Sequence, residues 1–201
     1  YILAYAERLV GSTYFFPKKS VTGTANIMMA APLAEGETKI GNAACEPEII
    51  QLGELLNSMG AKIKGLGEDF IYVDGVENLG GAEIQIIPDR IEAITMIIAG
   101  IITQGELKIE NINPLHIQKP IDLIRRCGAK FEIFEDSLFL KGSNSILPIS
   151  FETNPYPGIP TDIQAQLMVL NTIAEGDSRI KENIFENRFM HILELKRMGA
   201  N

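Results

Sequence analysis

The side chains best suited to chemistry lie at helix starts and in one polar segment near the end of the chain. Residues 18–21 read Lys-Lys-Ser-Val just before an apolar, helix-like stretch. Backbone N–H donors at a helix start, combined with lysines, could hold a phosphate. Residues 183–191 place amide, carboxylate, guanidinium and imidazole groups between apolar residues. These groups could either satisfy one another in a loop or contact a sugar or an acid.

A further helix start, residues 160–166, reads Pro-Thr-Asp-Ile-Gln-Ala-Gln. Thr161 followed by Gln164 fits a capping box, and Asp162 would lie favourably in the first turn against the helix dipole. This structural interpretation requires no catalysis. In the same way, Asp89 is expected to cap a helix that begins after Pro88.

Metal and nucleotide-cofactor motifs are not found. No Cys/His cluster has the spacing of metal ligands, and His116 and His191 are isolated. The sequence contains neither a P-loop nor a GxGxxG pattern. We therefore expect no metal ion and no cofactor.

An internal repeat must position these segments. Three similar segments place a glycine after a helix-like stretch, at Gly36, Gly105 and Gly176, and each is followed by a second helical pattern that ends in Gly-Ala. A repeat unit of roughly 70 residues is too long for the common helical solenoids. Mixed helix and strand order predicts an α/β protein, and the pattern alone leaves a solenoid or a barrel of such units open.

The repeat predicts particular elements. The first helix of each unit is expected at 26–34, 90–102 and 162–174, and strand pairs are expected at 62–64 and 70–73 and at 130–134 and 138–140. The apolar run 1–5 also has the composition of a strand. Because the chain opens on Tyr1 and stops before the strands of its third unit, we expect it to be incomplete at both ends.

Composition limits the classes of partner and the compartment. A net charge of −8 argues against non-specific nucleic-acid binding, which needs lysine and arginine at phosphates. Two cysteines give no disulfide framework, and no apolar run reaches the roughly 20 residues of a membrane span. The sequence predicts a cytoplasmic protein that binds no membrane. It says nothing about oligomeric state.

Four segments together resemble a known family. Residues 160–166, 184–191, 42–49 and 88–92 are similar to those of the UDP-N-acetylglucosamine 1-carboxyvinyltransferases, a branch of the enolpyruvyl transferases. The resemblance implies two domains, each an inside-out α/β barrel built from three repeats. Residues 1–87 would then be part of a first domain that grips the nucleotide sugar and phosphoenolpyruvate. Residues 88–201 would be part of a second domain that carries the catalytic base.

The resemblance also implies an activity and a site. The enzyme would transfer the enolpyruvyl group of phosphoenolpyruvate to the 3-hydroxyl of UDP-N-acetylglucosamine and release phosphate, the first committed step of peptidoglycan synthesis. Asp162 would be the general base and a sugar ligand, and Ile184 would contact the substrate through its backbone. The diphosphate and ribose region would be bound by Lys18, Lys19, Ser20 and Val21. Because the family's general acid lies upstream of Tyr1, the isolated chain is expected to be inactive.

Two alternatives stay open from the sequence. One is an enolpyruvyl transferase for shikimate 3-phosphate, with the same fold and reaction. The other is a non-catalytic paralogue that binds UDP-sugars, against which the intact Asp162 argues. Cys45 stands where many relatives carry arginine, so it is not the family's catalytic cysteine.

Overall fold

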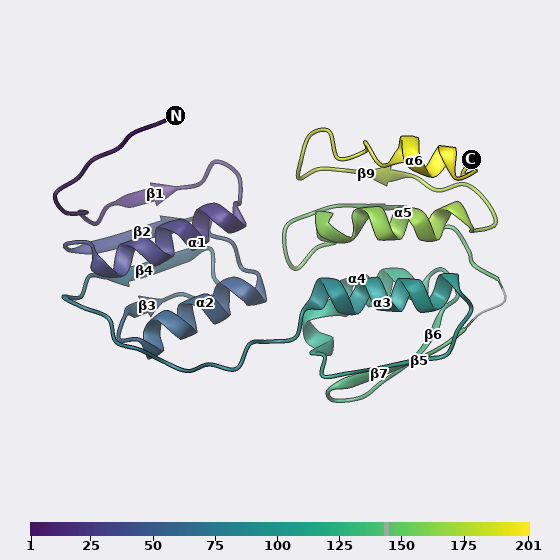
Figure 1. Ribbon diagram of the computed structural model, residues 1–201, viewed down its shortest axis with the longest axis horizontal. Helices are drawn as coiled ribbons and strands as arrows, with labels where there is room; N and C mark the ends of the chain where they lie inside the picture. The colour runs from purple at the N-terminus through teal and green to yellow at the C-terminus, as the bar shows by residue number, and fades with distance from the viewer. Residues whose placement is uncertain (143–144) are drawn as a thin grey trace. The chain divides into compact units, whose positions relative to one another are not determined.

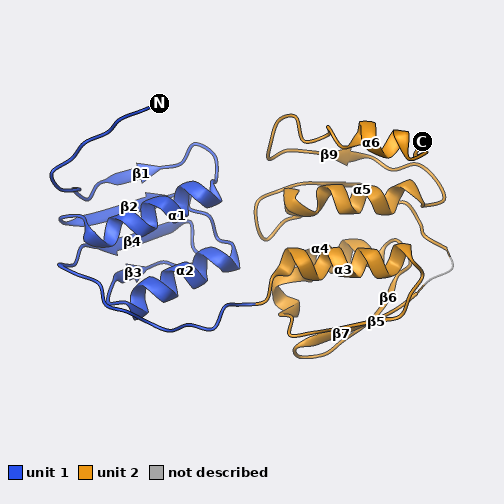
Figure 2. Cartoon of the chain, in the orientation of Figure 1, with its two compact units in different colours: residues 1–87 blue, residues 88–201 orange. Residues whose placement is uncertain are grey.

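The chain divides into two compact units, residues 1–87 and 88–201 (Figure 2). The structure is a computed structural model that describes residues 1–142 and 145–201. Both units combine short strands with helices, and the order of elements along the chain is drawn in Figure 1.

Unit 1 is a four-stranded sheet with helices packed against it. The sheet has the order β1-β2-β4-β3, in which β1 is parallel to β2 and the other pairs are antiparallel. The strands are β1 (Thr13–Phe15), β2 (Glu37–Gly41), β3 (Lys62–Lys64) and β4 (Phe70–Asp74). The helices are α1 (Val21–Ala30), α2 (Pro47–Ser58) and the 3-10 turn η1 (Ala31–Leu33).

The core of unit 1 follows from alternation along its strands. Ile71 and Val73 are buried on β4, where they pair with Ile40 of β2 and Ile63 of β3. Side chains two residues apart share one face of a strand, so these residues form a single apolar face. Met28 of α1 and residues of α2 pack in the same buried cluster, which places both helices on this face.

Unit 2 contains a three-stranded sheet and a separate parallel pair. The sheet has the order β5-β7-β6, and β8 pairs in parallel with β9. The strands are β5 (Leu107–Glu110), β6 (Lys130–Ile133), β7 (Ser137–Lys141), β8 (Phe151–Glu152) and β9 (Ile180–Lys181). The helices are α3 (Arg90–Ile102), α4 (Gln118–Arg125), α5 (Gln164–Thr172) and α6 (Ile192–Arg197), with 3-10 turns η2 (Pro114–Ile117) and η3 (Thr161–Ile163).

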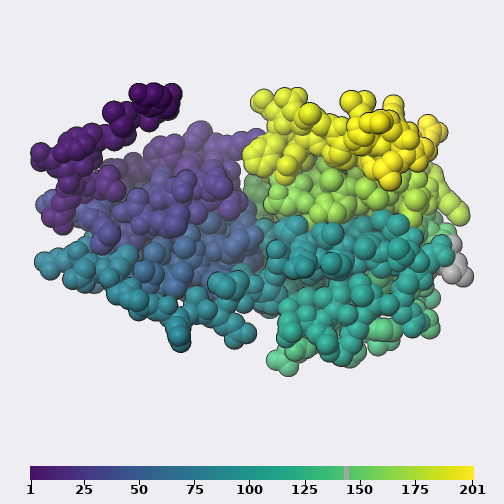
Figure 3. Space-filling view, in the orientation of Figure 1, coloured from purple at the N-terminus to yellow at the C-terminus, as the bar shows by residue number. Residues whose placement is uncertain are grey.

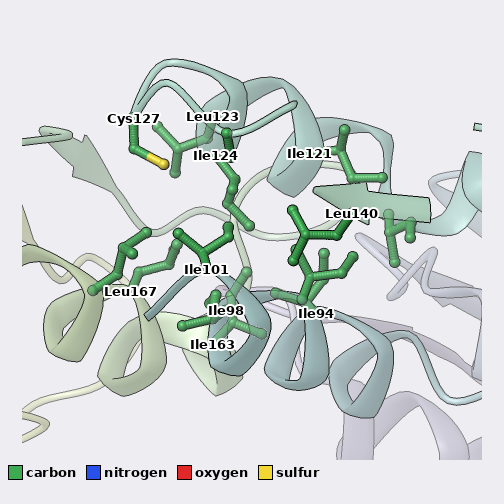
Figure 4. Close-up of a cluster of buried hydrophobic side chains, with 14 of the residues drawn as sticks. Ile94, Ile98, Ile101, Ile121, Leu123, Ile124, Cys127, Leu140, Ile163 and Leu167 are labelled. Atoms are coloured by element: carbon green, nitrogen blue, oxygen red, sulfur yellow. The ribbon is translucent and has the colours of Figure 1, made fainter. Parts of the chain in front are cut away.

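The central helix of unit 2 is α3. Its Ile94, Ile98 and Ile101 lie among side chains from α4, β7 and α5, as Figure 4 shows. Asp89 caps α3 as predicted, because its carboxylate accepts hydrogen bonds from the N–H groups of Ile91 and Glu92 at 2.8 and 3.0 Å. A helix apolar on most sides is expected to be buried on most sides.

Strand pairing confirms the predicted repeat. The three strands β2, β3 and β4 of unit 1 pair in the order β2-β4-β3, and the three strands β5, β6 and β7 of unit 2 pair in the corresponding order β5-β7-β6. The parallel pair β8–β9 corresponds to β1–β2. Gly36 and Gly176 have φ values of +85° and +131°, as a glycine after a helix predicts. In the middle repeat the positive φ belongs to Gln104, one residue before Gly105.

Two predictions of local structure are wrong. Residues 1–5 form no strand, and Leu3 is 87% exposed; Figure 3 shows the first residues, in dark purple, extending from the body of unit 1. A short apolar run becomes a strand only where a partner strand satisfies its backbone. The first helix begins at Val21 rather than 26, because Ser20 supplies its N-cap.

In the described part of the chain, no helix is both long and apolar enough to cross a membrane.

Candidate active site

The loop between β1 and α1 carries the four residues predicted to bind a diphosphate. Ser20 is the N-cap of α1, and its hydroxyl accepts a hydrogen bond from the N–H of Gly23 at 3.1 Å. Val21 is the first helical residue and is exposed, as is Lys18. The first N–H groups of a helix have no carbonyl partner within that helix. The helix start therefore presents N–H donors beside lysine side chains, an arrangement suited to an anion.

Lys19 is held in place by neighbouring loops. Its ammonium donates to the Ala43 carbonyl at 2.8 Å and to Asp69 Oδ1 at 2.6 Å, and lies 3.5 Å from Cys45 Sγ. Burial alone would lower the pKa of Lys19, but the hydrogen bond and charge of Asp69, together with Cys45, outweigh burial and raise the pKa. Lys19 is therefore a fixed positive charge at neutral pH.

In unit 2, Asp162 lies in η3 and is exposed. Its Oδ1 accepts a hydrogen bond from Arg188 Nη2 at 3.1 Å, and the two side chains are 55% and 43% exposed. The carboxylate is thus oriented by a neighbour and still open to a ligand.

The capping box predicted for this helix start is wrong. The N-cap is Pro160, and the Thr161 hydroxyl donates to Glu182 Oε2 at 2.9 Å. Gln164 is 1% exposed, and its amide nitrogen has no hydrogen-bond partner. Because Thr161 lies within the first turn rather than before it, its hydroxyl is free to contact another segment.

Ile184 lies in the loop after β9, where Glu182 organises the backbone. The N–H groups of Ile184 and Phe185 donate to Glu182 Oε1 at 2.8 and 3.1 Å, and the Thr153 hydroxyl donates to the same oxygen at 2.8 Å. Burial alone would raise the pKa of Glu182, but these hydrogen bonds and that of Thr161 outweigh burial and lower the pKa.

The predicted residues fall into two groups. Lys18, Lys19, Ser20 and Val21 are contiguous in unit 1, and Asp162 and Ile184 are linked through Glu182 in unit 2. Residues 18–21 and Asp162 both follow the first strand of a parallel pair, β1 or β8, so the repeat brings them to corresponding places in the two units. Ile184 follows the second strand of its pair, β9.

Sequence reasoning missed Asp69 and Glu182. Asp69 contacts Lys19 across 50 residues of chain, and no local pattern marks it. Glu182 had a weak signal, since it is an acid directly after a strand, at the start of a segment rich in polar groups. Among residues 1–142 and 145–201, no group of three or more His, Cys, Asp or Glu is placed to hold a metal ion.

The two cysteines are free and differ in environment, which gives a testable difference in reactivity. Cys127 is 1% exposed, and burial raises the pKa of its thiol, whereas Cys45 is only partly buried. Because the thiolate is the nucleophile, iodoacetamide at neutral pH is expected to label Cys45 at least about tenfold faster than Cys127. Peptide mass spectrometry over a time course measures both rates, and equal rates in the native protein would contradict these environments.

Known structures share this fold. The enolpyruvyl transferase NikO from Streptomyces tendae superimposes with a TM-score of 0.85 at 23% identity, over 95% of this chain and 48% of that one. An EPSP synthase from Acinetobacter baumannii gives a TM-score of 0.64 at 22% identity, over 96% of this chain and 46% of that one. Such low identities support the fold alone. The protein is thus an α/β protein with the enolpyruvyl transferase fold, as the sequence predicted.

The family follows from the sequence. The EPSP synthase (3-phosphoshikimate 1-carboxyvinyltransferase) family matches residues 2–201, and the chain belongs to this family. Relatives named UDP-N-acetylglucosamine 1-carboxyvinyltransferase from Acidobacterium capsulatum and Desulfosudis oleivorans are 52% and 47% identical over all of this chain, which covers 46% and 48% of their lengths. The relative of the same name, numbered 1, from Caldanaerobacter subterraneus subsp. tengcongensis is 49% identical. The chain spans about half the length of the curated relatives it matches, and the resemblance inferred from its motifs is confirmed.

Proposed function

We propose that the full-length protein transfers the enolpyruvyl group of phosphoenolpyruvate to the 3-hydroxyl of UDP-N-acetylglucosamine and releases phosphate. This is the first committed step of peptidoglycan synthesis. The observation that carries the proposal is the 52% identity, over the whole chain, to a relative named for this reaction. The exposed carboxylate of Asp162, at the start of η3, supplies the chemistry that the reaction needs.

Asp162 is the general base in this proposal. The sugar hydroxyl becomes acidic as its oxygen bonds to the enolpyruvyl carbon, and the carboxylate can accept the proton as that bond forms. The hydrogen bond from Arg188 to Oδ1 leaves the other carboxylate oxygen for the sugar. The backbone of Ile184, fixed by Glu182, contacts the same substrate.

Unit 1 binds the nucleotide end of the substrate. The ammonium of Lys19 is charged and held by Asp69, and the start of α1 presents N–H donors. Lys18, Ser20 and Val21 complete the segment that contacts the diphosphate and ribose. Residues 1–87 accordingly belong to a domain that grips the nucleotide sugar and phosphoenolpyruvate, and residues 88–201 to the domain that carries the base.

The enzyme acts in the cytoplasm on small-molecule substrates. The two free cysteines, Cys45 and Cys127, support a reducing compartment. A net charge of −8 argues against a polyanionic partner such as nucleic acid.

Phosphate release by the full-length protein tests this proposal. Phosphoenolpyruvate is supplied with either UDP-N-acetylglucosamine or shikimate 3-phosphate, and the expected result is release only with the nucleotide sugar. Release only with shikimate 3-phosphate would keep the reaction and overturn the acceptor. Binding of the nucleotide sugar without any phosphate release would indicate a non-catalytic UDP-sugar-binding protein.

A further inference from the structure

Glu182 collects hydrogen bonds from three separate segments of unit 2. Its carboxylate accepts from Thr153 after β8, from Thr161 in η3, and from the N–H groups of Ile184 and Phe185 after β9. All four distances lie between 2.8 and 3.1 Å. One side chain therefore ties together the segments that carry Asp162 and Ile184, although none of these four hydrogen bonds comes from either of those side chains.

The direction of the hydrogen bonds extends this connection to Asp162. A threonine hydroxyl has one proton, and Thr161 gives it to Glu182 Oε2. The Thr161 oxygen is then oriented as an acceptor, and it receives a hydrogen bond from Arg188 Nε at 3.2 Å. The same guanidinium donates through Nη2 to Asp162 Oδ1 at 3.1 Å. The order of contacts is Glu182, Thr161, Arg188, Asp162.

The charge of Glu182 is essential to this arrangement. A carboxylate has two oxygens that only accept hydrogen bonds, which suits four donors. A glutamine has one oxygen and one NH₂ group, so its NH₂ group would face donors that now bond to a carboxylate oxygen. Hydrogen bonds that favour the ionised form lower the pKa of Glu182 against the opposing effect of burial. Removing the charge would leave Thr161 or the backbone N–H groups without an acceptor.

We infer that Glu182 is a positioning residue for the transfer reaction: through Thr161 and Arg188 it orients the Asp162 carboxylate, and through the backbone it fixes the loop at Ile184. This inference rests on the proposed function, because it assigns Asp162 the role of base. Displacement of a reacting group by about 1 Å can reduce a rate by about 10²-fold. Loss of Glu182 is therefore expected to lower kcat.

The test compares three variants of the full-length protein. Glu182→Gln removes the charge at nearly constant size, Glu182→Asp keeps the charge, and Glu175→Gln changes an exposed carboxylate in the same unit as a control. We expect Glu182→Gln to lower kcat about 10- to 100-fold while the KM for phosphoenolpyruvate changes less than about threefold. Glu182→Asp should recover part of kcat, and Glu175→Gln should match the wild type.

Amide hydrogen exchange at Ile184 and Phe185 supplies a readout that needs no activity. Both amides should exchange at least about tenfold faster in a fourth variant, Glu182→Ala, than in the wild type, because alanine offers neither of them an acceptor. An active wild type with unchanged kcat in Glu182→Gln would overturn the inference and leave the proposed function intact. An inactive wild type would overturn the proposed function and, with it, the role in turnover. Unchanged exchange would overturn the anchoring itself.

Discussion

Replacing Asp162 with asparagine is expected to lower kcat of the full-length protein by about 10²- to 10⁴-fold, the range typical for loss of a general base. Asparagine has nearly the same shape, and its carbonyl oxygen can still accept the hydrogen bond from Arg188. An amide oxygen cannot take up the proton of the sugar hydroxyl at neutral pH. Because Asp162 is exposed, the substitution leaves no buried group without a partner.

Steady-state phosphate release and thermal unfolding together measure this effect. Asp136→Asn is the matched control, since Asp136 is an exposed aspartate in the turn between β6 and β7 of the same unit. The melting temperatures of both variants should lie within about 2 °C of that of the wild type, because a surface substitution changes the free energy of unfolding by less than roughly 0.5 kcal/mol. Ordinary turnover by Asp162→Asn would remove Asp162 from the mechanism.

Replacing Lys19 with methionine is expected to weaken binding of the nucleotide sugar by about 10- to 100-fold. A hydrogen bond to a charged group contributes about 1.5–3 kcal/mol, and about 1.4 kcal/mol corresponds to a factor of ten in affinity. Methionine fills a similar volume but brings no charge to the diphosphate. Of the partners left behind, Asp69 has a side chain that is 73% exposed, so solvent can satisfy it, whereas the carbonyl of the buried Ala43 loses its hydrogen bond from Lys19.

Isothermal titration with the nucleotide sugar measures the change in Kd directly. Lys62→Met in β3 is the control, because Lys62 is an exposed lysine of the same unit outside the candidate site. Its Kd should match that of the wild type. If the Kd of Lys19→Met is within about twofold of the wild-type Kd, Lys19 only supports the loops around it.

Much of the fold could be predicted because the spacing of apolar residues repeats along the chain. The helix expected at 90–102 and the strand expected at 62–64 have those bounds in the structure. In both cases the flanking signals are local: Asp89 caps one element, and a glycine precedes the other. Elements defined by their own residues are the ones that sequence reasoning recovers.

The predictions that were wrong concern elements that depend on contacts between residues distant in sequence. Thr161 and Gln164 have the residue types of a capping box, but Thr161 bonds to Glu182, 21 residues away. The Thr161 oxygen, which would accept a backbone N–H in a cap, instead accepts from the Arg188 guanidinium, 27 residues away. A charged donor forms a stronger hydrogen bond than a neutral backbone N–H. The run 1–5 failed for the same reason, because its strand character required a partner strand that the structure does not provide.

The candidate site shows the same division. The motifs at 18–21 and 160–166 identified the segments, whereas Asp69 and Glu182, which hold those segments in position, came only from the structure. Supporting residues are selected by geometry rather than by a local pattern. Their spacing along the chain therefore carries little information.

The proposed transfer is tested most directly by following the three-carbon group itself. The full-length protein is incubated with UDP-N-acetylglucosamine and phosphoenolpyruvate labelled with ¹³C in its carbon skeleton, and the product is examined by NMR. We expect the labelled enolpyruvyl group to become linked to O3 of the sugar, with one phosphate released for each product formed. Label that remains in phosphoenolpyruvate while the nucleotide sugar is bound, or label linked to another acceptor, would contradict it.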